Sequence, residues 1–241
     1  LTITEQVDLG FAAATITAHP NKPLLYVAAP RGDEGSTPAA VVSLNDHGSY
    51  ETHIKSNLSH GYAYLSLDRT SRFLLGVNYW DGFVDVYALS SDGSIGRRVT
   101  ALNEGRKNAH CIWPSPDNKF VYIPYVKDTN GLFQYRFDAE TGGLKPLAPK
   151  NANPPAATGP RHMAYHPTKP IAYFSNEQHL GVSVYDIGES GLLTIRQVCD
   201  LVGDDESKQG VSSSDIVITP DGRFLFAGIR GHQRDYDWIS R

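Results

Sequence analysis

The sequence predicts an all-β protein, a β-propeller of four-stranded antiparallel blades with about five blades in its 241 residues. One pattern recurs five times: an apolar run, a turn, and a second apolar run, with turn positions at Pro20, Arg69, Pro116, Pro167 and Pro220. The spacings of 49, 47, 51 and 53 residues give a period of about 50, which is typical of propeller blades. No window keeps a 3.6-residue apolar period, so we expect almost no helix.

Each recurrence predicts the two inner strands of one blade, and these hairpins start near Ala14, Tyr64, His110, Arg161 and Ser214. The third repeat shows a complete blade. Short β-branched and aromatic runs separated by Asn-Gly and Gly-Gly turns predict strands over 110–114, 120–126, 132–138 and 143–148. Radial packing of such sheets leaves only short, protected edges.

The two ends of the chain need separate treatment. Residues 1–9, LTITEQVDL, resemble the fourth strand of a blade, and the last repeat stops after a third strand near Trp238. These strands either close a five-bladed ring by sharing a blade or belong to a larger propeller. We treat residues 1–241 as one propeller domain, incomplete at one or both ends, and leave open a removed leader before it.

Composition excludes several partners. A formal net charge of -4 offers no basic stripe for nucleic acid, and no run of 18 apolar residues suggests a membrane span. Cys111 and Cys199 fall in predicted strands of different repeats, so we interpret them as small core residues and expect a reducing, cytoplasmic location. The oligomeric state stays open.

Aligning the repeats identifies candidate functional residues. In an up-and-down blade, the start of the first strand and the end of the second open on the same rim. Six residues before the turn, the repeats carry Ala14, Ala63, His110, Arg161 and Ser214; ten residues after it, they carry Pro30, Tyr79, Val126, Glu177 and Arg230. We therefore expect four ionisable side chains to converge on one mouth of the channel: His110, Arg161, Glu177 and Arg230. Solvated rim charges or a structural ion-pair network are the alternative interpretation.

Other polar and aromatic residues lie close to these positions in the repeats. Asn78, Trp80 and His179 lie near the same rim and are candidate ligand contacts. By strand alternation, His162 and Asp215 should point the other way and pack between blades. His19 and His166 precede turn prolines at the opposite face, where we expect them to stabilise the turns.

Several segments also resemble a known family. AHCIWPSPDNKFVYIP, TGPRHMAYHPTKPIAYFSNE, VSVYDI and DIVITPDGRFLFAGIRG are similar to the bacterial 6-phosphogluconolactonase family of seven-bladed propellers, whose fold is similar to that of carboxymuconate lactonizing enzymes. The most specific part is Gly159-Pro160-Arg161-His162-Met163, with Glu177 sixteen residues after Arg161. The resemblance implies a ring of seven blades and an active-site set of His110, Arg161, Glu177 and Arg230.

The residue types suit the opening of a lactone, which needs a base for the attacking water and positive charge at the developing oxyanion. His110 could be the base, with Glu177 orienting its ring directly or through one water, or Glu177 could activate the water itself. Arg161 and Arg230 present planar donors for a carboxylate or phosphate, so a small anionic lactone or related acid is the expected ligand. We expect no metal, because the rim has one carboxylate, and no cofactor, because no G-x-G-x-x-G motif opens a helix.

Three hypotheses follow. The first is a metal-independent hydrolase acting on an anionic sugar lactone, with 6-phosphogluconolactone as the leading substrate. The second is a cycloisomerase of the carboxymuconate type, using the same arginine clamp with a proton donor. The third is a non-catalytic propeller that binds a ligand on its rim, for which the rim charges would be dispensable.

Overall fold

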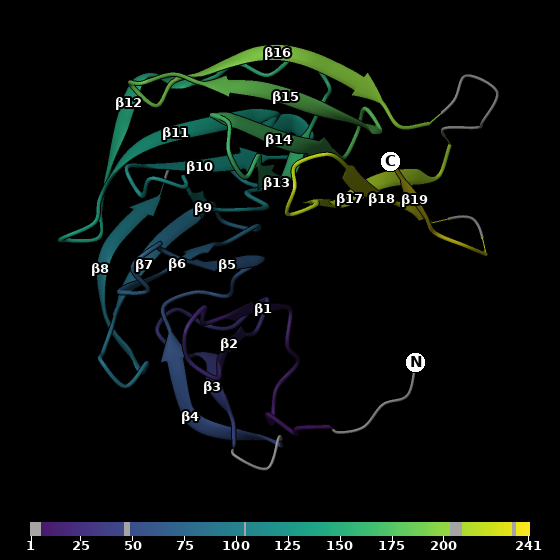
Figure 1. Ribbon diagram of the computed structural model, residues 1–241. Helices are drawn as coiled ribbons and strands as arrows, with labels where there is room; N and C mark the ends of the chain where they lie inside the picture. Colours follow the sequence, from purple (N-terminus) through teal and green to yellow (C-terminus); the bar gives the residue numbers. More distant parts are fainter. Residues whose placement is uncertain (1–5, 46–48, 104, 203–208, 233–234) are drawn as a thin grey trace. The chain divides into compact units, whose positions relative to one another are not determined.

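The computed structural model describes residues 6–45, 49–103, 105–202, 209–232 and 235–241 (Figure 1). These residues form four four-stranded antiparallel sheets and one three-stranded sheet, and their only helical turn is the 3-10 helix Lys127–Thr129. The expected five blades with almost no helix are confirmed. Contacts between Cα atoms divide the chain into two compact units, residues 1–106 with 138–143 and residues 107–137 with 144–241.

The first unit holds two complete blades. Their strands run in chain order from the inner to the outer strand: β1 (Thr15–Ala18), β2 (Leu24–Ala28), β3 (Thr37–Leu44) and β4 (Tyr50–Leu58), then β5 (Tyr64–Leu67), β6 (Phe73–Val77), β7 (Phe83–Leu89) and β8 (Ile95–Asn103). A buried core that includes Tyr26, Tyr62 and Leu74 fills the space between the two sheets. Large Tyr and Leu side chains therefore account for the packing of one blade on the next.

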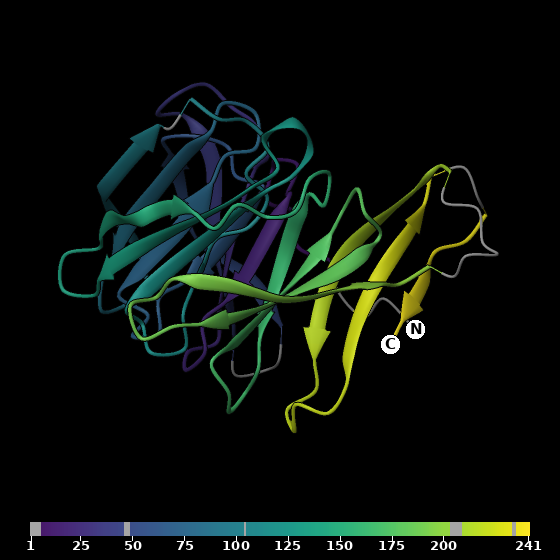
Figure 2. The ribbon, with the colours of Figure 1, turned by 90° about the horizontal axis from the view of Figure 1, so that it is seen from above.

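The second unit holds the other three sheets. Their strands are β9 (Trp113–Pro114), β10 (Phe120–Tyr125), β11 (Gly131–Asp138), β12 (Gly143–Asn151), β13 (Pro160–Tyr165), β14 (Ile171–Asn176), β15 (Gly181–Ile187), β16 (Leu193–Asp200), β17 (Val211–Ile218), β18 (Leu225–Gly231) and β19 (Trp238–Ser240). The last sheet has three strands, as predicted (Figures 1 and 2).

One predicted inner strand is much shorter than expected. The sequence predicts a strand over 110–114, but only Trp113–Pro114 form β9, with a separate bridge between Ala109 and Tyr125. Four residue steps from Ala109 to Trp113 face three from Tyr122 to Tyr125, so the register slips. Pro124 also has no N–H to donate to this ladder. The irregular stretch contains His110.

The strand expected at the start of the chain is not formed in its described part. Residues 1–5 lie outside the described residues, and residues 6–9 are not in a strand. Leu9 and Phe11 instead pack against Val27, Ala40 and Val42 and cover a face of the first sheet. Because the side chains make these contacts, the segment is held without ladder hydrogen bonds. Closure of a ring through this segment, and the treatment of residues 1–241 as one domain, stay predictions.

The turn between the first and second strands has the same design in all five sheets. The residue just before each turn position accepts turn N–H groups through its side chain; these residues are His19, Asp68, Ser115, His166 and Thr219. Nδ1 of His166, for example, accepts from the N–H groups of Thr168 and Lys169, both at 3.1 Å. The predicted turn-stabilising role of His19 and His166 is confirmed.

A second repeated contact ties neighbouring sheets together. The Tyr26 hydroxyl on β2 donates to the carbonyl oxygen of Gly93 in the next sheet at 2.9 Å, and the Tyr122 hydroxyl on β10 donates to that of Gly191 at 2.8 Å. Both tyrosines stand six residues after their turn positions. The two glycines have φ of 94° and 84°, which favour glycine in this turn.

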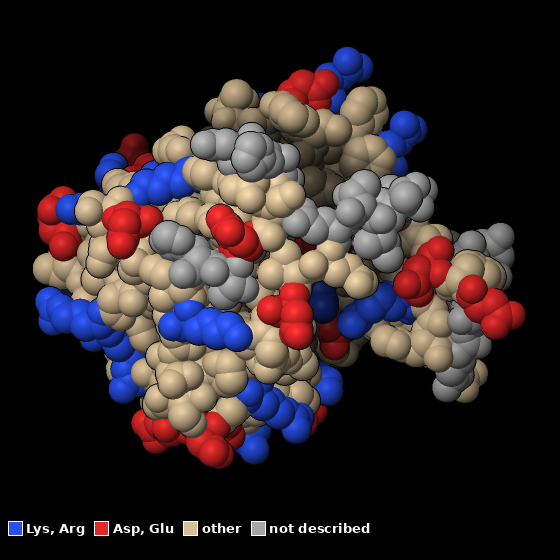
Figure 3. Space-filling view, turned by 90° about the horizontal axis from the view of Figure 1, so that it is seen from below, with Lys and Arg blue, Asp and Glu red and all other residues tan. Residues whose placement is uncertain are grey.

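The cysteines and the surface charges complete the description of the fold. Cys111 is fully buried and Cys199 half-buried, and neither forms a disulfide. On the face shown in Figure 3, acidic and basic side chains are interspersed. Of the residues that the structure describes, none forms a helix with the length and hydropathy of a membrane span.

Candidate functional site

Three of the four predicted catalytic side chains meet in the second unit. Arg161 lies in β13, Glu177 directly follows β14, and Arg230 lies in β18. Nε of Arg161 donates to Oε2 of Glu177 at 2.9 Å, and Nη2 of Arg230 donates to the same oxygen at 3.1 Å. The side chains of Arg161 and Glu177 are only 11% and 12% exposed. Two guanidinium groups therefore share one largely buried carboxylate.

The backbone before Arg161 positions this pair. The carbonyl oxygen of Gly159 accepts from the N–H of Glu177 at 2.7 Å, and the N–H of Gly159 donates to Oδ1 of Asn130 at 2.7 Å. Gly159 has a φ of 61°, and a Cβ there would lie 1.5 Å from Oε1 of Gln178. A residue with a side chain would fit this position only if Gln178 moved. The geometry therefore explains why glycine precedes Pro160 and Arg161.

Two β-bulges lie beside the arginines. The register of β13 against β14 shifts between Pro160 and Met163, and that of β17 against β18 shifts between Ser213 and Ile216. In each case three steps on the inner strand face two on its partner. A bulge interrupts strict side-chain alternation and redirects the side chains within it. Arg161 and His162 lie in the first bulge, and Asp215 lies in the second.

His110 adds a neutral imidazole to this group. Burial, and next the positive charge of Arg161, lower the pKa of His110 to about 2, so its ring is neutral near pH 7. The ring meets that of His162 edge to face, with centroids 5.1 Å apart. Nδ1 of His162 lies 2.9 Å from Oδ1 of Asp215, and burial lowers the pKa of His162 despite this contact.

His162 and Asp215 lie only in part where strand alternation predicts. As strand alternation predicts, the pair joins two neighbouring sheets, because His162 lies in β13 and Asp215 in β17. His162 also contacts His110, however, and so belongs with the charged group, an outcome that the alternation argument missed. The bulge at Pro160 is the reason, and bulges leave no clear signal in a single sequence.

The direct hydrogen bond expected between His110 and Glu177 is not formed. Oε2 of Glu177 accepts from Arg161 and Arg230, and Nε2 of Gln178 lies 3.3 Å from Oε1. A link through one water stays a prediction. Nε of Arg230 and Oγ of Ser213 are buried and have no hydrogen-bond partner among the described residues. A buried donor without a partner is costly, so these atoms are well suited to meet a ligand.

The three candidate ligand contacts are divided between the two units. His179 stands in the turn after β14, with Nδ1 3.3 Å from Oδ1 of Asp200 at the end of the outermost strand. Asn78 belongs to the first unit and is buried; its amide donates to the carbonyl oxygen of Gly61 at 2.7 Å. Trp80, in the same unit, is 43% exposed. A role for these residues with the same ligand stays a prediction.

The donor set around Glu177 does not suit a metal ion. Its carboxylate is held by two cations, which would repel a third. Among the described residues, no three His, Cys, Asp or Glu side chains gather in a way that could hold a metal.

Comparison with known proteins bears on this site. A family model described as "Lactonase, 7-bladed beta-propeller" matches residues 1–239. The chain is 34% identical over 229 residues to a 6-phosphogluconolactonase of Cronobacter sakazakii, and 32% identical over 234 residues to one of Klebsiella pneumoniae. Each match covers 94% of this chain and 66% of the relative, so the chain spans just under two thirds of these relatives' length.

A solved structure shows the same fold. The periplasmic gluconolactonase of Pseudomonas aeruginosa superimposes with a TM-score of 0.79 at 24% identity. The superposition covers 90% of this chain and 65% of that one.

Proposed function

The chain belongs to the family of seven-bladed β-propeller lactonases, and we propose on that premise that the protein hydrolyses an anionic sugar lactone, with 6-phosphogluconolactone the first substrate to test. The names of its relatives support this substrate. The observation that carries the proposal is the partly buried group of two arginines, one glutamate and a neutral histidine in one unit. Such a group is suited to bind an anion and to transfer a proton beside it.

The arginines would hold the anionic group of the substrate. Arg230 has a buried Nε without a partner among the described residues, and its side chain is 34% exposed, so a ligand can reach part of its guanidinium group. A carboxylate or phosphate oxygen at this Nε would satisfy the donor. The same positive charges would stabilise the oxyanion that develops on the lactone carbonyl.

The proposed reaction is an addition followed by ring opening. A water molecule gives a proton to the base, and its oxygen attacks the carbonyl carbon. The tetrahedral intermediate then collapses, the bond from the carbonyl carbon to the ring oxygen breaks, and the ring oxygen takes up a proton. The products are a hydroxyl group and a carboxylic acid, which ionises and releases one proton to solution.

His110 is the better candidate for the base. Its ring is neutral and can accept a proton, whereas both oxygens of Glu177 lie near donor groups. A pKa of about 2 makes the ring a weak base in the absence of a ligand. An anion bound at Arg161 would offset the positive charge that lowers this pKa, so substrate binding would strengthen the base.

The direct test is an assay of the purified protein on 6-phosphogluconolactone, read as proton release at constant pH against the spontaneous rate. Carboxymuconate is assayed beside it, by loss of the absorbance of its conjugated diene. Acceleration of lactone opening alone supports the proposal. Activity on carboxymuconate alone assigns the site to a cycloisomerase, and binding of either compound without turnover assigns it to a non-catalytic propeller.

Metal independence is part of the proposal. Arg161 and Arg230 already neutralise the carboxylate of Glu177, and their positive charges would repel a metal cation there. Treatment with EDTA followed by removal of the chelator should leave the lactonase rate unchanged. A loss of activity that Ca²⁺ or Zn²⁺ restores would contradict this part alone.

A further inference from the structure

A second histidine–carboxylate pair is buried in the first unit, within residues 1–106. Nδ1 of His60 lies 2.6 Å from Oδ2 of Asp85, and the ring of His60 stacks on Phe83 at a centroid distance of 3.7 Å. His60 is 6% exposed and Asp85 is fully buried. The stacking and the hydrogen bond together hold the imidazole in one orientation.

The carboxylate of Asp85 is fully engaged by this network. Its Oδ2 also accepts from the Tyr62 hydroxyl at 2.6 Å, and Nη1 of Arg98 lies 3.3 Å from its Oδ1. An ionised carboxylate can only accept hydrogen bonds, so Nδ1 of His60 carries the proton. In the neutral ring, Nε2 is then a lone-pair acceptor.

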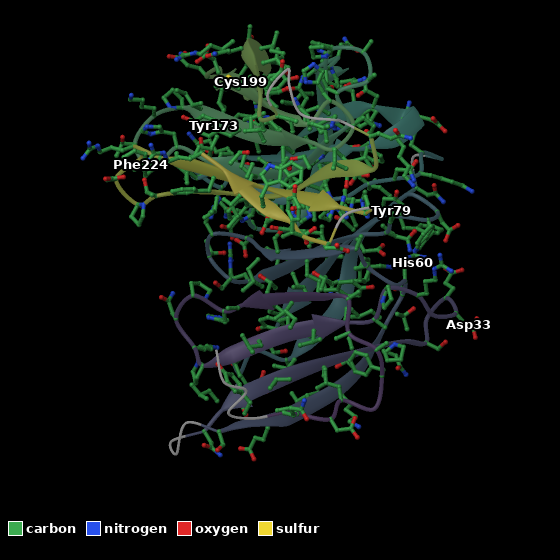
Figure 4. All side chains as sticks on the ribbon, turned by 90° about the vertical axis from the view of Figure 1, so that its right-hand side faces the viewer. Asp33, His60, Tyr79, Tyr173, Cys199 and Phe224 are labelled. Atoms are coloured by element: carbon green, nitrogen blue, oxygen red, sulfur yellow. The ribbon has the colours of Figure 1, made fainter. Side chains whose placement is uncertain are left out.

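Nε2 of His60 makes no hydrogen bond within the part of the chain that the structure describes. The atom is buried, and Oε1 of Glu34 lies 3.9 Å from it. His60 lines a cavity of about 300 Å³, at the lower end of the range for small-molecule sites, together with Arg31, Gly32, Gly61, Asn78, Trp80 and Asp81. Figure 4 shows His60 on the same side of the unit as Tyr79, the neighbour of Trp80.

The rest of the lining combines an aromatic face with charges of both signs. The guanidinium of Arg31 lies 3.9 Å from the centre of the Trp80 ring, and the Tyr79 ring meets the Trp80 ring edge to face with centroids 4.8 Å apart. Asp81 lines the cavity and Glu34 lies beside His60, so a free anion would meet two carboxylates. A simple cation would meet Arg31.

The cavity offers an acceptor, Nε2 of His60, and a donor, Arg31. A neutral hydroxyl group suits both, since it can donate one hydrogen bond and accept another. We propose that this cavity is a second ligand site that binds a small neutral polyhydroxylated molecule, with one hydroxyl donating to Nε2 of His60 and another accepting from Arg31. The exposed face of Trp80 would pack on the carbon skeleton of the ligand. The proposal concerns the first unit alone and does not depend on lactonase activity.

The test follows the imidazole nitrogens of the ¹⁵N-labelled protein by NMR while D-glucose is added up to 200 mM. The His60 signals are assigned by their loss in His60→Gln. We expect a saturable shift at Nε2 of His60 with millimolar affinity, weakened at least tenfold in Arg31→Ala and in Trp80→Ala. Arg31 is exposed and Trp80 is 43% exposed, so these variants should fold. Arg97→Ala, at an exposed arginine on β8, is the matched control and should bind as the wild type does.

Three outcomes would overturn the proposal. The first is the absence of a saturable shift at His60 with glucose and with the open-chain polyol sorbitol. The second is a shift with D-gluconate or inorganic phosphate but not with the neutral compounds, which would make the cavity an anion site. The third is binding that survives both Arg31→Ala and Trp80→Ala, which would place the ligand elsewhere.

Discussion

Arg161 and Arg230 both contact one oxygen of Glu177, and this sharing decides how single substitutions there should behave. Removing the carboxylate would leave Arg161 buried without its counter-charge, which typically costs about 3–5 kcal/mol. Alanine at Glu177 would therefore mix a loss of stability with any loss of catalysis. His110 is neutral, so it can be changed without leaving a buried charge unpaired.

The base is tested first by His110→Ala. We expect kcat for the lactone to fall by about a hundredfold or more, because a positioned base contributes about that much to a proton transfer. The far-ultraviolet circular dichroism should not change. His166→Asn is the control, since asparagine can still accept from the turn N–H groups, and it should keep full activity. Full activity in both His110→Ala and Glu177→Gln would remove the case for an enzyme at this site.

The clamp is tested by Arg161→Lys. Lysine keeps the charge but lacks the planar fork, so we expect a raised KM as well as a lower kcat. Arg196→Lys is a matched control, because Arg196 also pairs through Nε with a carboxylate, Asp186, at 3.1 Å, but on the surface of the same unit. An unchanged KM in Arg161→Lys would mean that Arg161 does not touch the substrate.

His110 should also make folding dependent on pH. Its pKa is about 2 in the folded chain and ordinarily about 6.5, so between these values the unfolded chain binds a proton that the folded chain does not. Protonation of His110 in the unfolded chain therefore has little effect on stability above pH 6.5 and lowers the free energy of unfolding as the pH drops below that value. From pH 7 to pH 5 the loss due to this residue is about 2 kcal/mol.

Urea unfolding at pH 7 and pH 5 measures this loss, with His110→Gln as the comparison. The variant should lose about 2 kcal/mol less than the wild type over that range, because it has no group to protonate at this position. Equal losses in both proteins would show that His110 is not held neutral by its surroundings.

At the scale of the strand and the sheet, the tyrosine contact between neighbouring blades makes its own prediction. Tyr122→Phe removes the hydrogen bond to Gly191 and leaves the packing of the ring, so we expect a loss of about 1 kcal/mol in the free energy of unfolding. Tyr26→Phe should lose a similar amount, because the Tyr26–Gly93 contact is equivalent.

The fourth blade supplies the control for this prediction. Tyr173 stands at the equivalent position, six residues after Pro167, but its hydroxyl makes no hydrogen bond within the described residues. Tyr173→Phe should therefore change stability by a few tenths of a kcal/mol at most. A loss in Tyr173→Phe as large as that in Tyr122→Phe would assign the effect to packing instead.

At the scale of the whole molecule, the open question is whether residues 1–241 unfold together. A repeat cannot bury its apolar face alone, and the same tyrosine contact joins blades in each of the two units. We therefore expect a single transition. The three tryptophans of the chain can report on the two units separately, since Trp80 lies in the first unit and Trp113 and Trp238 lie in the second.

Variants with one tryptophan each, the others replaced by phenylalanine, would be unfolded in urea and followed by fluorescence. Coincident midpoints for Trp80 and Trp113 would support one domain. An earlier transition at Trp80 than at both other tryptophans would divide the chain into two folding units at about residue 106.

Much of the architecture could be predicted because it depends on local patterns that repeat. The five hairpins, the near absence of helix and the three-stranded last sheet follow from alternating apolar runs and turn residues at a regular spacing. The convergence of Arg161, Glu177 and Arg230 follows from the same regularity, since equivalent positions in successive blades open on one rim. The turn histidines could be placed for the same reason.

What only the tertiary structure decided are the departures from that regularity and the contacts between residues far apart in sequence. The bulges that bring His162 to His110, the slipped register around β9, and the packing of Leu9 and Phe11 on the first sheet all depend on which neighbours compete for each side chain. The pairing of His60 with Asp85 joins a loop to a strand 25 residues away, and no periodic pattern marks it. Alternation describes the average strand, whereas burial and charge at one position are set by residues from several sheets.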